Sequence, residues 1–193
     1  MPGAKSRPTS LSRGELNLRA LPFLFILISF LPSCKPDNVQ KGATLKYFDL
    51  KGYFSADTAR LNKLTTNPIL KTVNHNKVIE TKKVVIKNWG NELSLFLASD
   101  INKPAWRDSY DIRDNGDVVI YKARYPELKT REIIINKPNN KVKWILIFNS
   151  TKNMLYQTSE KLSYFPDSAY VIAKYQKVRL LGANQYKITG LFQ

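Results

Sequence analysis

The chain has 193 residues and carries 31 lysines and arginines against 15 aspartates and glutamates, a formal net charge of +16 at neutral pH. It holds one cysteine and one histidine, which excludes a disulfide within one chain and a metal site built from His and Cys side chains. A length of this order corresponds to a single domain.

The N-terminal segment is basic and is followed by an uncharged, almost wholly apolar run from Ala20 to Cys34. A helix that crosses the bilayer core needs about 20 apolar residues. The run is shorter and interrupted by Pro22 and Pro32, and it fits the roughly 7 to 15 apolar residues of a secretory signal behind a basic region. The segment therefore predicts export.

The last four residues of this run, Leu31-Pro32-Ser33-Cys34, resemble the lipobox of bacterial lipoproteins: an apolar residue lies three before the cysteine and a small one just before it. The resemblance implies cleavage between Ser33 and Cys34, a diacylglyceryl group on the Cys34 thiol, and a stable anchor once two or more acyl chains are attached. It also implies a bacterial envelope location, anchored in the outer membrane on the periplasmic side by default, with surface exposure left open. The alternatives are an ordinary cleaved signal and an uncleaved anchor helix.

The predicted organisation is a cleaved signal peptide over residues 1–33, a flexible tether over 34–45 and one globular domain over 46–193. Removal of the signal takes away four basic residues and one acidic residue, which leaves 27 against 14, a net charge of about +13. Without a disulfide, the stability of this domain must come from its hydrophobic core.

The first part of the predicted domain contains two helices with a hairpin between them. Apolar residues at helical spacing predict a helix over Lys46–Thr66. Two β-branched runs, Ile69–Val73 and Val78–Ile86, flank the turn-forming residues Asn74–Lys77 and predict a hairpin. Asn88 is a candidate helix cap, and the stripe Trp89, Leu93, Phe96, Leu97 and Ile101 predicts a second helix that ends before Pro104.

The rest of the chain has strand periodicity and turn-rich breaks, Asn115-Gly116 among them. The predicted strands are Ser109–Arg113, Val118–Tyr125, Thr130–Asn136, Val142–Phe148, Met154–Tyr164, Ala169–Leu180 and Gln185–Phe192. The run around Trp144 is apolar on both faces, which indicates an interior strand, and Tyr170, Ile172, Val178, Tyr186 and Ile188 are expected to point inward. We expect an α+β fold in which an antiparallel meander of about six to seven strands forms a curved sheet.

The excess of basic residues is the most informative feature of the predicted domain. Near an anionic membrane each such residue contributes about 1 kcal/mol within a Debye length. Export excludes nucleic acid, so the expected partners are membrane lipid through acylated Cys34 and anionic phospholipid, lipopolysaccharide or an envelope protein. The alternative interpretation is that the positive charge binds no partner and only keeps the domain soluble. The candidate binding residues are Lys122, Arg124, Lys129, Arg131, Lys137, Lys141, Lys143 and Lys152.

The leading functional prediction is a non-catalytic binding or assembly module that uses a basic sheet face. A lipid or glycan carrier, with an apolar groove between sheet and helices, is the alternative. An envelope hydrolase would need a pair of carboxylates, and the possible members are Glu80, Glu92, Glu132 and Glu160. His75 lies in a predicted turn, and the chain offers no serine in a nucleophile-elbow context to pair with it, so we expect no catalytic residue. We also expect no metal and no cofactor.

Aspartates and tyrosines recur in the strand half. The spacing of Asp108, Asp111, Asp114 and Asp117 does not match a calcium-binding loop, and the tyrosines are expected mainly in core or sheet packing. Asp57-Thr58-Ala59 and Asp167-Ser168-Ala169 resemble the short motif that some Gram-negative envelopes O-glycosylate. With the lysine-rich body, they make the chain similar to envelope lipoproteins of that group, a resemblance that implies no activity.

Overall fold

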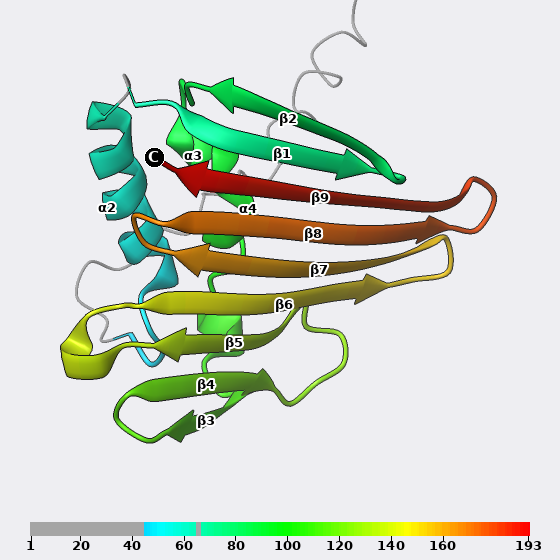
Figure 1. The fold of residues 1–193 in the computed structure, drawn as a ribbon. Helices are drawn as coiled ribbons and strands as arrows, with labels where there is room; N and C mark the ends of the chain where they lie inside the picture. Colours follow the sequence, from blue (N-terminus) through cyan, green and yellow to red (C-terminus); the bar gives the residue numbers. More distant parts are fainter. Residues whose placement is uncertain (1–44, 65–66) are drawn as a thin grey trace, which may run out of the picture. The chain divides into compact units, whose positions relative to one another are not determined.

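The computed structural model describes residues 45–64 and 67–193, which belong to one compact unit spanning Thr44–Gln193 (Figure 1). The helices are α2 (Leu50–Lys63), α3 (Trp89–Glu92) and α4 (Ser94–Leu97). The strands are β1 (Ile69–His75), β2 (Val78–Val84), β3 (Tyr110–Asp114), β4 (Val118–Ala123), β5 (Thr130–Asn136), β6 (Trp144–Lys152), β7 (Tyr156–Phe165), β8 (Ala169–Val178) and β9 (Gly182–Phe192). The predicted α+β class is confirmed in this broad sense.

All these strands form one antiparallel sheet in the order β2-β1-β9-β8-β7-β6-β5-β4-β3. Strands β3 to β9 follow one another as a meander, as the short connections predict. The sheet nevertheless has nine strands among the described residues, not six to seven. The prediction was wrong because β1 pairs with β9, from Ile69 opposite Phe192 to His75 opposite Tyr186, and thereby adds the N-terminal hairpin to the sheet.

Only one of the two predicted N-terminal helices is a long one. Helix α2 has 14 residues, and the Asp49 side chain caps it by accepting a hydrogen bond from the Gly52 N–H. The second region consists of α3 and α4, four residues each, separated by a break at Leu93. Gly90 and Asn91 occupy its first turn and favour a helix weakly, which accounts for the correction. Asn88 does cap α3, with a hydrogen bond of 3.0 Å from the Asn91 N–H.

The strand boundaries follow the predicted turns closely. Strand β5 has the predicted bounds, and Gly116, with a φ of 90°, occupies the predicted β3–β4 turn. The β1–β2 turn is tighter than expected, because Asn76 and Lys77 adopt positive φ and close it as two residues. Strand β6 starts two residues later than predicted and continues to Lys152, four residues past its predicted end at Phe148.

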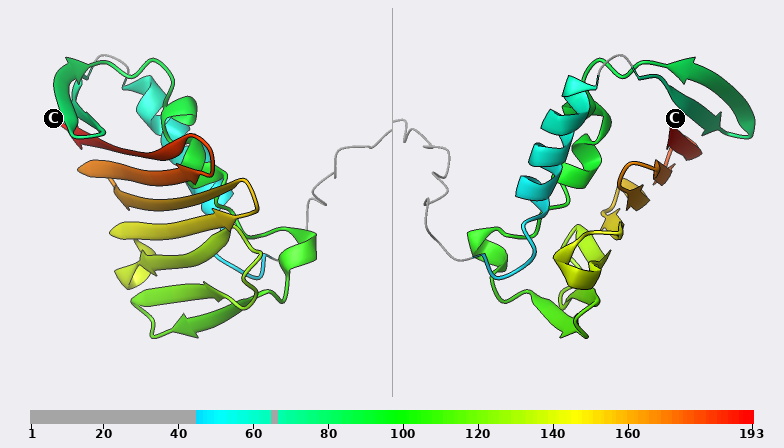
Figure 2. Two further views of the ribbon diagram at one scale, coloured as in Figure 1. Left: turned by 90° about the vertical axis from the view of Figure 1, so that its right-hand side faces the viewer. Right: turned by 60° about the vertical axis from the view of Figure 1, so that its left-hand side comes forward.

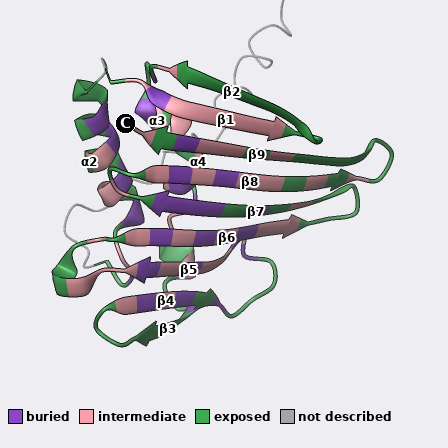
Figure 3. Cartoon of the chain, viewed as in Figure 1, coloured by how far each residue is buried: buried purple, intermediate pink, exposed green. Residues whose placement is uncertain are grey.

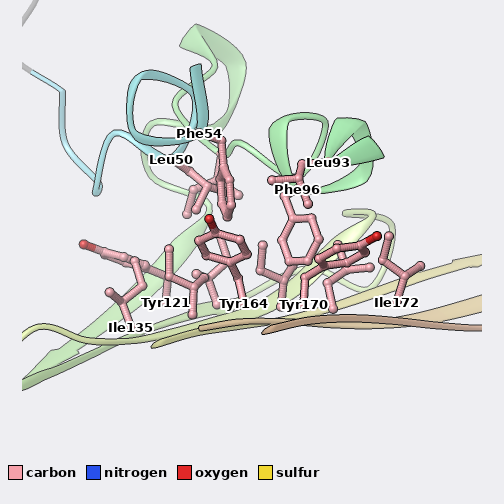
Figure 4. Packing of buried hydrophobic residues seen from close by; sticks show 14 of the residues in the cluster. Leu50, Phe54, Leu93, Phe96, Tyr121, Ile135, Tyr164, Tyr170 and Ile172 are labelled. Atoms are coloured by element: carbon pink, nitrogen blue, oxygen red, sulfur yellow. The ribbon is translucent and has the colours of Figure 1, made fainter. Parts of the chain in front are cut away.

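The core lies between the helices and one face of the sheet (Figures 2 and 4). Buried residues alternate along the middle strands (Figure 3), with Ile145 and Ile147 in β6 fully enclosed. The ring centroid of Phe54 in α2 lies 5.0 Å from that of Phe96 in α4 and 5.0 Å from that of Tyr164 in β7. Large aromatic side chains therefore fill this part of the space between sheet and helices. A small pocket of about 150 Å³ remains at one end of it, with Leu61, Ile69, Trp89 and Phe192 among its lining residues.

Candidate functional site

The face of the sheet turned away from the helices has no second layer over it within residues 45–64 and 67–193 (Figure 2). We call it the open face. Directly paired residues of antiparallel strands share a face, so Ile120, Ile134 and Leu146 lie side by side on it. The large aliphatic residues, Phe and Trp of this face, half-buried or exposed, are Leu70, Ile79, Val118, Ile120, Ile134, Trp144, Leu146, Phe148, Phe165, Val171 and Leu191.

Basic side chains outnumber acidic ones on the same face. Within the described strands the pairing places seven basic residues there, namely Lys83, Arg113, Lys122, Lys152, Lys161, Lys177 and Lys187. It places two acidic residues there, Asp111 and Glu132. The Lys161 ammonium lies 5.5 Å from the centre of the Phe148 ring, so apolar and basic groups are interleaved. The open face is thus both apolar and positively charged.

The structure divides the eight basic residues singled out from sequence among several places. Lys122 and Lys152 lie on the open face by register. Lys137, Lys141 and Lys143 gather at the β5–β6 connection, at one end of the sheet. The three remaining residues are engaged: Arg124 pairs with Asp111 at 2.8 Å, Lys129 with Glu160 at 3.8 Å, and Arg131 donates to backbone carbonyls of Tyr125 and Leu128. Their role in binding stays a prediction.

A polar cleft of about 380 Å³ lies on the opposite face of the sheet, near Glu160 of β7. The β6, β7, β8 and β9 strands extend past the helices there (Figure 1). The Glu160 side chain is 4% exposed and pairs with Lys174 at 3.2 Å as well as with Lys129. The cleft is lined by Lys129, Asn149, Ser150, Thr151, Tyr156, Thr158, Glu160, Lys174 and Gln176. Nothing in the local sequence marks Asn149 or Lys174, because only the pairing of β6, β7 and β8 brings them together.

The four glutamates considered for a hydrolase have different surroundings. Glu132 lies on the open face and Glu160 on the helix-facing side. Glu92 pairs with Lys71 at 2.7 Å and accepts a hydrogen bond from the Tyr170 hydroxyl. Glu80 pairs with a neighbouring lysine on the exposed β2 strand. Glu132 and Glu160 are thus separated by the sheet, and Glu80, Glu92 and Glu160 all form ion pairs.

The aspartates considered as calcium ligands and the histidine considered as a catalytic base contact other residues of the domain. Asp108 pairs with Lys46 at 2.6 Å, and this contact lowers the pKa of the carboxyl. Asp114 accepts a hydrogen bond from the Gly116 N–H inside the turn. His75 is exposed, and its Nε2 lies 2.9 Å from the Asn184 side-chain oxygen. Among the described residues no three His, Cys, Asp or Glu side chains form a cluster suited to a metal ion.

Buried tyrosines connect the sheet to the helices. The Tyr164 hydroxyl donates to Asp57 in α2, and the Tyr170 hydroxyl donates to Glu92 in α3. Burial raises the pKa of both phenols, and the acceptor carboxylates raise it further. The prediction that tyrosines pack in the core is confirmed for these two and for Tyr110, which is 1% exposed.

Cys34, the predicted lipid-attachment residue, and the predicted cleavage site between Ser33 and Cys34 lie outside the described residues. The same holds for the predicted signal peptide and for all but the last residue of the predicted tether. Among the described residues no helix combines the length and the apolar character needed to span a membrane. The two motifs that resemble O-glycosylation sites differ in exposure. Thr58 of the first is buried and its hydroxyl donates to the Phe54 carbonyl, whereas Ser168 of the second is exposed.

Comparison with protein-family models, with curated proteins and with solved structures finds no match to this chain.

Proposed function

We propose that the chain is a membrane-anchored envelope lipoprotein whose domain is a non-catalytic binding module, and that its open face binds an anionic membrane surface. The observation that carries this proposal is the composition of that face, on which seven basic residues accompany two acidic ones around an apolar centre. Basic residues near an anionic leaflet contribute about 1 kcal/mol each. A net excess of five would therefore dominate the interaction at low salt.

The apolar centre of the open face supports a lipid surface over a purely electrostatic partner. Trp144, Leu146 and Phe148 succeed one another on the same side of β6, and none is fully buried. Aromatic side chains with an apolar body and a polar edge favour the headgroup region of a bilayer. Lysines such as Lys161 can lay their apolar stems along this surface while the ammonium reaches a phosphate.

The short distance in sequence between Cys34 and the domain also favours the membrane as partner. Residues 34–45 can span at most about 3.5 Å each, so a lipid on Cys34 would keep the domain within about 40 Å of the same membrane. Such a tether raises the effective concentration of the open face at the lipid surface without any new contact. A weak surface interaction is then sufficient to orient the domain.

Trp144 provides a direct test of this orientation. The lipidated full-length protein is reconstituted into phosphatidylcholine vesicles with and without phosphatidylglycerol, each containing acyl-brominated lipid that quenches nearby tryptophan. Of the three tryptophans, Trp89 is 4% exposed in the core and half-buried Trp106 packs against the core cluster. The quenching that wild type shows and Trp144→Phe lacks therefore reports Trp144, and it should increase in the anionic vesicles. Equal quenching of the two proteins would exclude contact between the open face and lipid.

Charge reversal supplies a matched control. Lys161→Glu with Lys187→Glu removes positive charge from the open face, whereas Lys51→Glu with Lys63→Glu makes the same change on the exposed side of α2. Only the first pair should abolish the added quenching in anionic vesicles. If both pairs have the same effect, net charge alone attracts the domain and the open face has no special role.

The anchor requires a separate test. Wild type and Cys34→Ala are compared by metabolic labelling with a fatty-acid analogue and by membrane fractionation. We expect label and membrane retention only in wild type. An unlabelled, released wild type would refute the lipoprotein proposal and leave a secreted binding domain to be tested.

A further inference from the structure

We propose that the polar cleft at Glu160 binds a sugar unit that carries an anionic group, either a carboxylate or a phosphate. This site lies on the helix-facing side of the sheet and is independent of the membrane contact proposed for the open face. It combines a carboxylate that already has cationic partners, an amide oxygen without a partner, and walls of hydroxyl and amide groups.

The orientation of the Asn149 side chain follows from its two neighbours. The Ser99 hydroxyl donates to the Leu95 carbonyl at 2.7 Å, so it accepts the bond of 2.9 Å from Asn149 Nδ2. The same amide nitrogen donates to Glu160 Oε2 at 3.2 Å. A rotated amide would set its oxygen against the Glu160 carboxylate. The nitrogen therefore faces both acceptors, and Asn149 Oδ1 points elsewhere.

Asn149 Oδ1 is buried and has no hydrogen-bond partner among the residues that the structure describes. Asn149 as a whole is 3% exposed and contributes to the lining of the cleft. Buried polar atoms in proteins are almost always paired with protein or with an ordered molecule. The unpaired oxygen therefore calls for a hydrogen-bond donor. It is closed off from solvent in the free protein, so the hydroxyl group of a ligand can supply this bond once the Asn149 amide or a wall of the cleft shifts.

The charges of the cleft favour an anionic ligand. Lys174 and Lys129 both face the single Glu160 carboxylate, at 3.2 and 3.8 Å, and their side chains are 24% and 42% exposed. Each ammonium has three donors, so one bond to Glu160 leaves others free for a ligand. Two lysines against one glutamate give the site one excess positive charge, which a carboxylate or a phosphate would neutralise.

The walls of the cleft favour a sugar over a lipid tail. Its volume of about 380 Å³ is at the small end of ligand sites. The side chains of Thr151, Thr158 and Gln176 offer hydroxyl and amide groups, and Tyr156, 38% exposed, adds an aromatic ring of the kind on which sugars stack. Apolar aliphatic side chains are absent from this lining.

The test uses the lipidated full-length protein in phosphatidylcholine nanodiscs and saturation-transfer difference NMR, which observes the sugar. The probes are glucuronate, glucose 6-phosphate and neutral glucose. We expect saturable transfer to one or both anionic sugars, and their ranking identifies a carboxylate or a phosphate site. Absence of transfer to both, or equal transfer to glucose, would overturn the proposal.

Two variants and one control locate the binding. Lys174→Met removes a cation of the cleft, and Thr158→Val removes a hydroxyl with little change in shape. Lys177→Met is the control: it makes the same substitution three residues from Lys174 on β8, but on the open face. Affinity should fall about tenfold or more in the first two, a difference of about 1.4 kcal/mol or more, and stay unchanged in the control. Unchanged affinity in folded Thr158→Val and Lys174→Met, or an equal loss in Lys177→Met, would place the sugar elsewhere.

Discussion

Gly190→Ala is the substitution whose effect the structure determines most sharply. Gly190 in β9 pairs with Tyr170 in β8, and the Tyr170 ring lies over the glycine. A Cβ at position 190 would come within 2.7 Å of the Tyr170 hydroxyl oxygen and closer still to the ring atoms Cε1 and Cζ. The ring must therefore move, although it is completely buried and packs edge-on against Trp89.

The cost has two parts. Overpacking of a filled core typically destabilises a protein by about 1–3 kcal/mol. A displaced Tyr170 also loses its hydrogen bond to Glu92, and hydrogen bonds to charged groups contribute about 1.5–3 kcal/mol. We expect Gly190→Ala to lower the free energy of unfolding by about 3–5 kcal/mol, a large share of the 5–15 kcal/mol typical of a domain.

A double-mutant cycle with Tyr170→Leu isolates the contact. The leucine removes the ring and the hydroxyl, so adding Gly190→Ala to it should cost about 1 kcal/mol or less, and the coupling energy should be about 2 kcal/mol or more. Equilibrium unfolding in urea, followed by circular dichroism, measures all four proteins. If Gly190→Ala costs the same with and without the Tyr170 ring, the β8–β9 register described here is incorrect.

Three further predictions concern stability. Phe54→Ala, which opens the space between α2 and β7, should cost about 3–5 kcal/mol in urea unfolding, and a cost below 1 kcal/mol would mean that α2 does not cover the sheet. Gly116→Ala should cost about 1 kcal/mol by the same measurement, because φ is 90° although the site is open; an unchanged midpoint would contradict the turn. Burial raises the pKa of four enclosed phenols, so the folded state keeps protons that the unfolded state releases above pH 10. Stability is then complete below pH 10 and falls by about 1.4 kcal/mol per pH unit for each phenol above it. Part of the phenolate absorbance should therefore rise only together with the loss of circular dichroism, and complete ionisation of all ten tyrosines before unfolding would contradict the burial of Tyr110, Tyr121, Tyr164 and Tyr170.

Local sequence patterns predict most of the strands because the turns are chemically distinct. The Asn115-Gly116 turn and the inward positions Tyr170 and Ile172 are correct. The pairing of β1 with β9 could not be predicted in this way, because Ile69 and Phe192 lie far apart in the sequence and local periodicity does not indicate which strands become neighbours. The count of strands in the sheet failed for this reason alone.

The same limitation applies to the polar cleft. Asn149 and Ser99 are 50 residues apart, and their hydrogen bond depends on where α4 ends over the sheet. The sequence shows which residues are basic but not which face of the sheet each of them occupies, because that depends on strand register. The pairing places Lys161, Lys177 and Lys187 on the open face, whereas Lys129 pairs with Glu160 on the other side.

The edges of the sheet differ from its open face in a way that favours a planar partner. Edge strand β2 carries Glu80, Lys82 and Lys83, and edge strand β3 carries Asp111 and Arg113. Charges on edge strands oppose the addition of further strands, so growth of the sheet by edge pairing is disfavoured. The middle of the open face instead keeps large apolar side chains half-exposed. A partner that covers a broad face and does not pair with backbone groups fits both observations, and an anionic bilayer surface has that geometry.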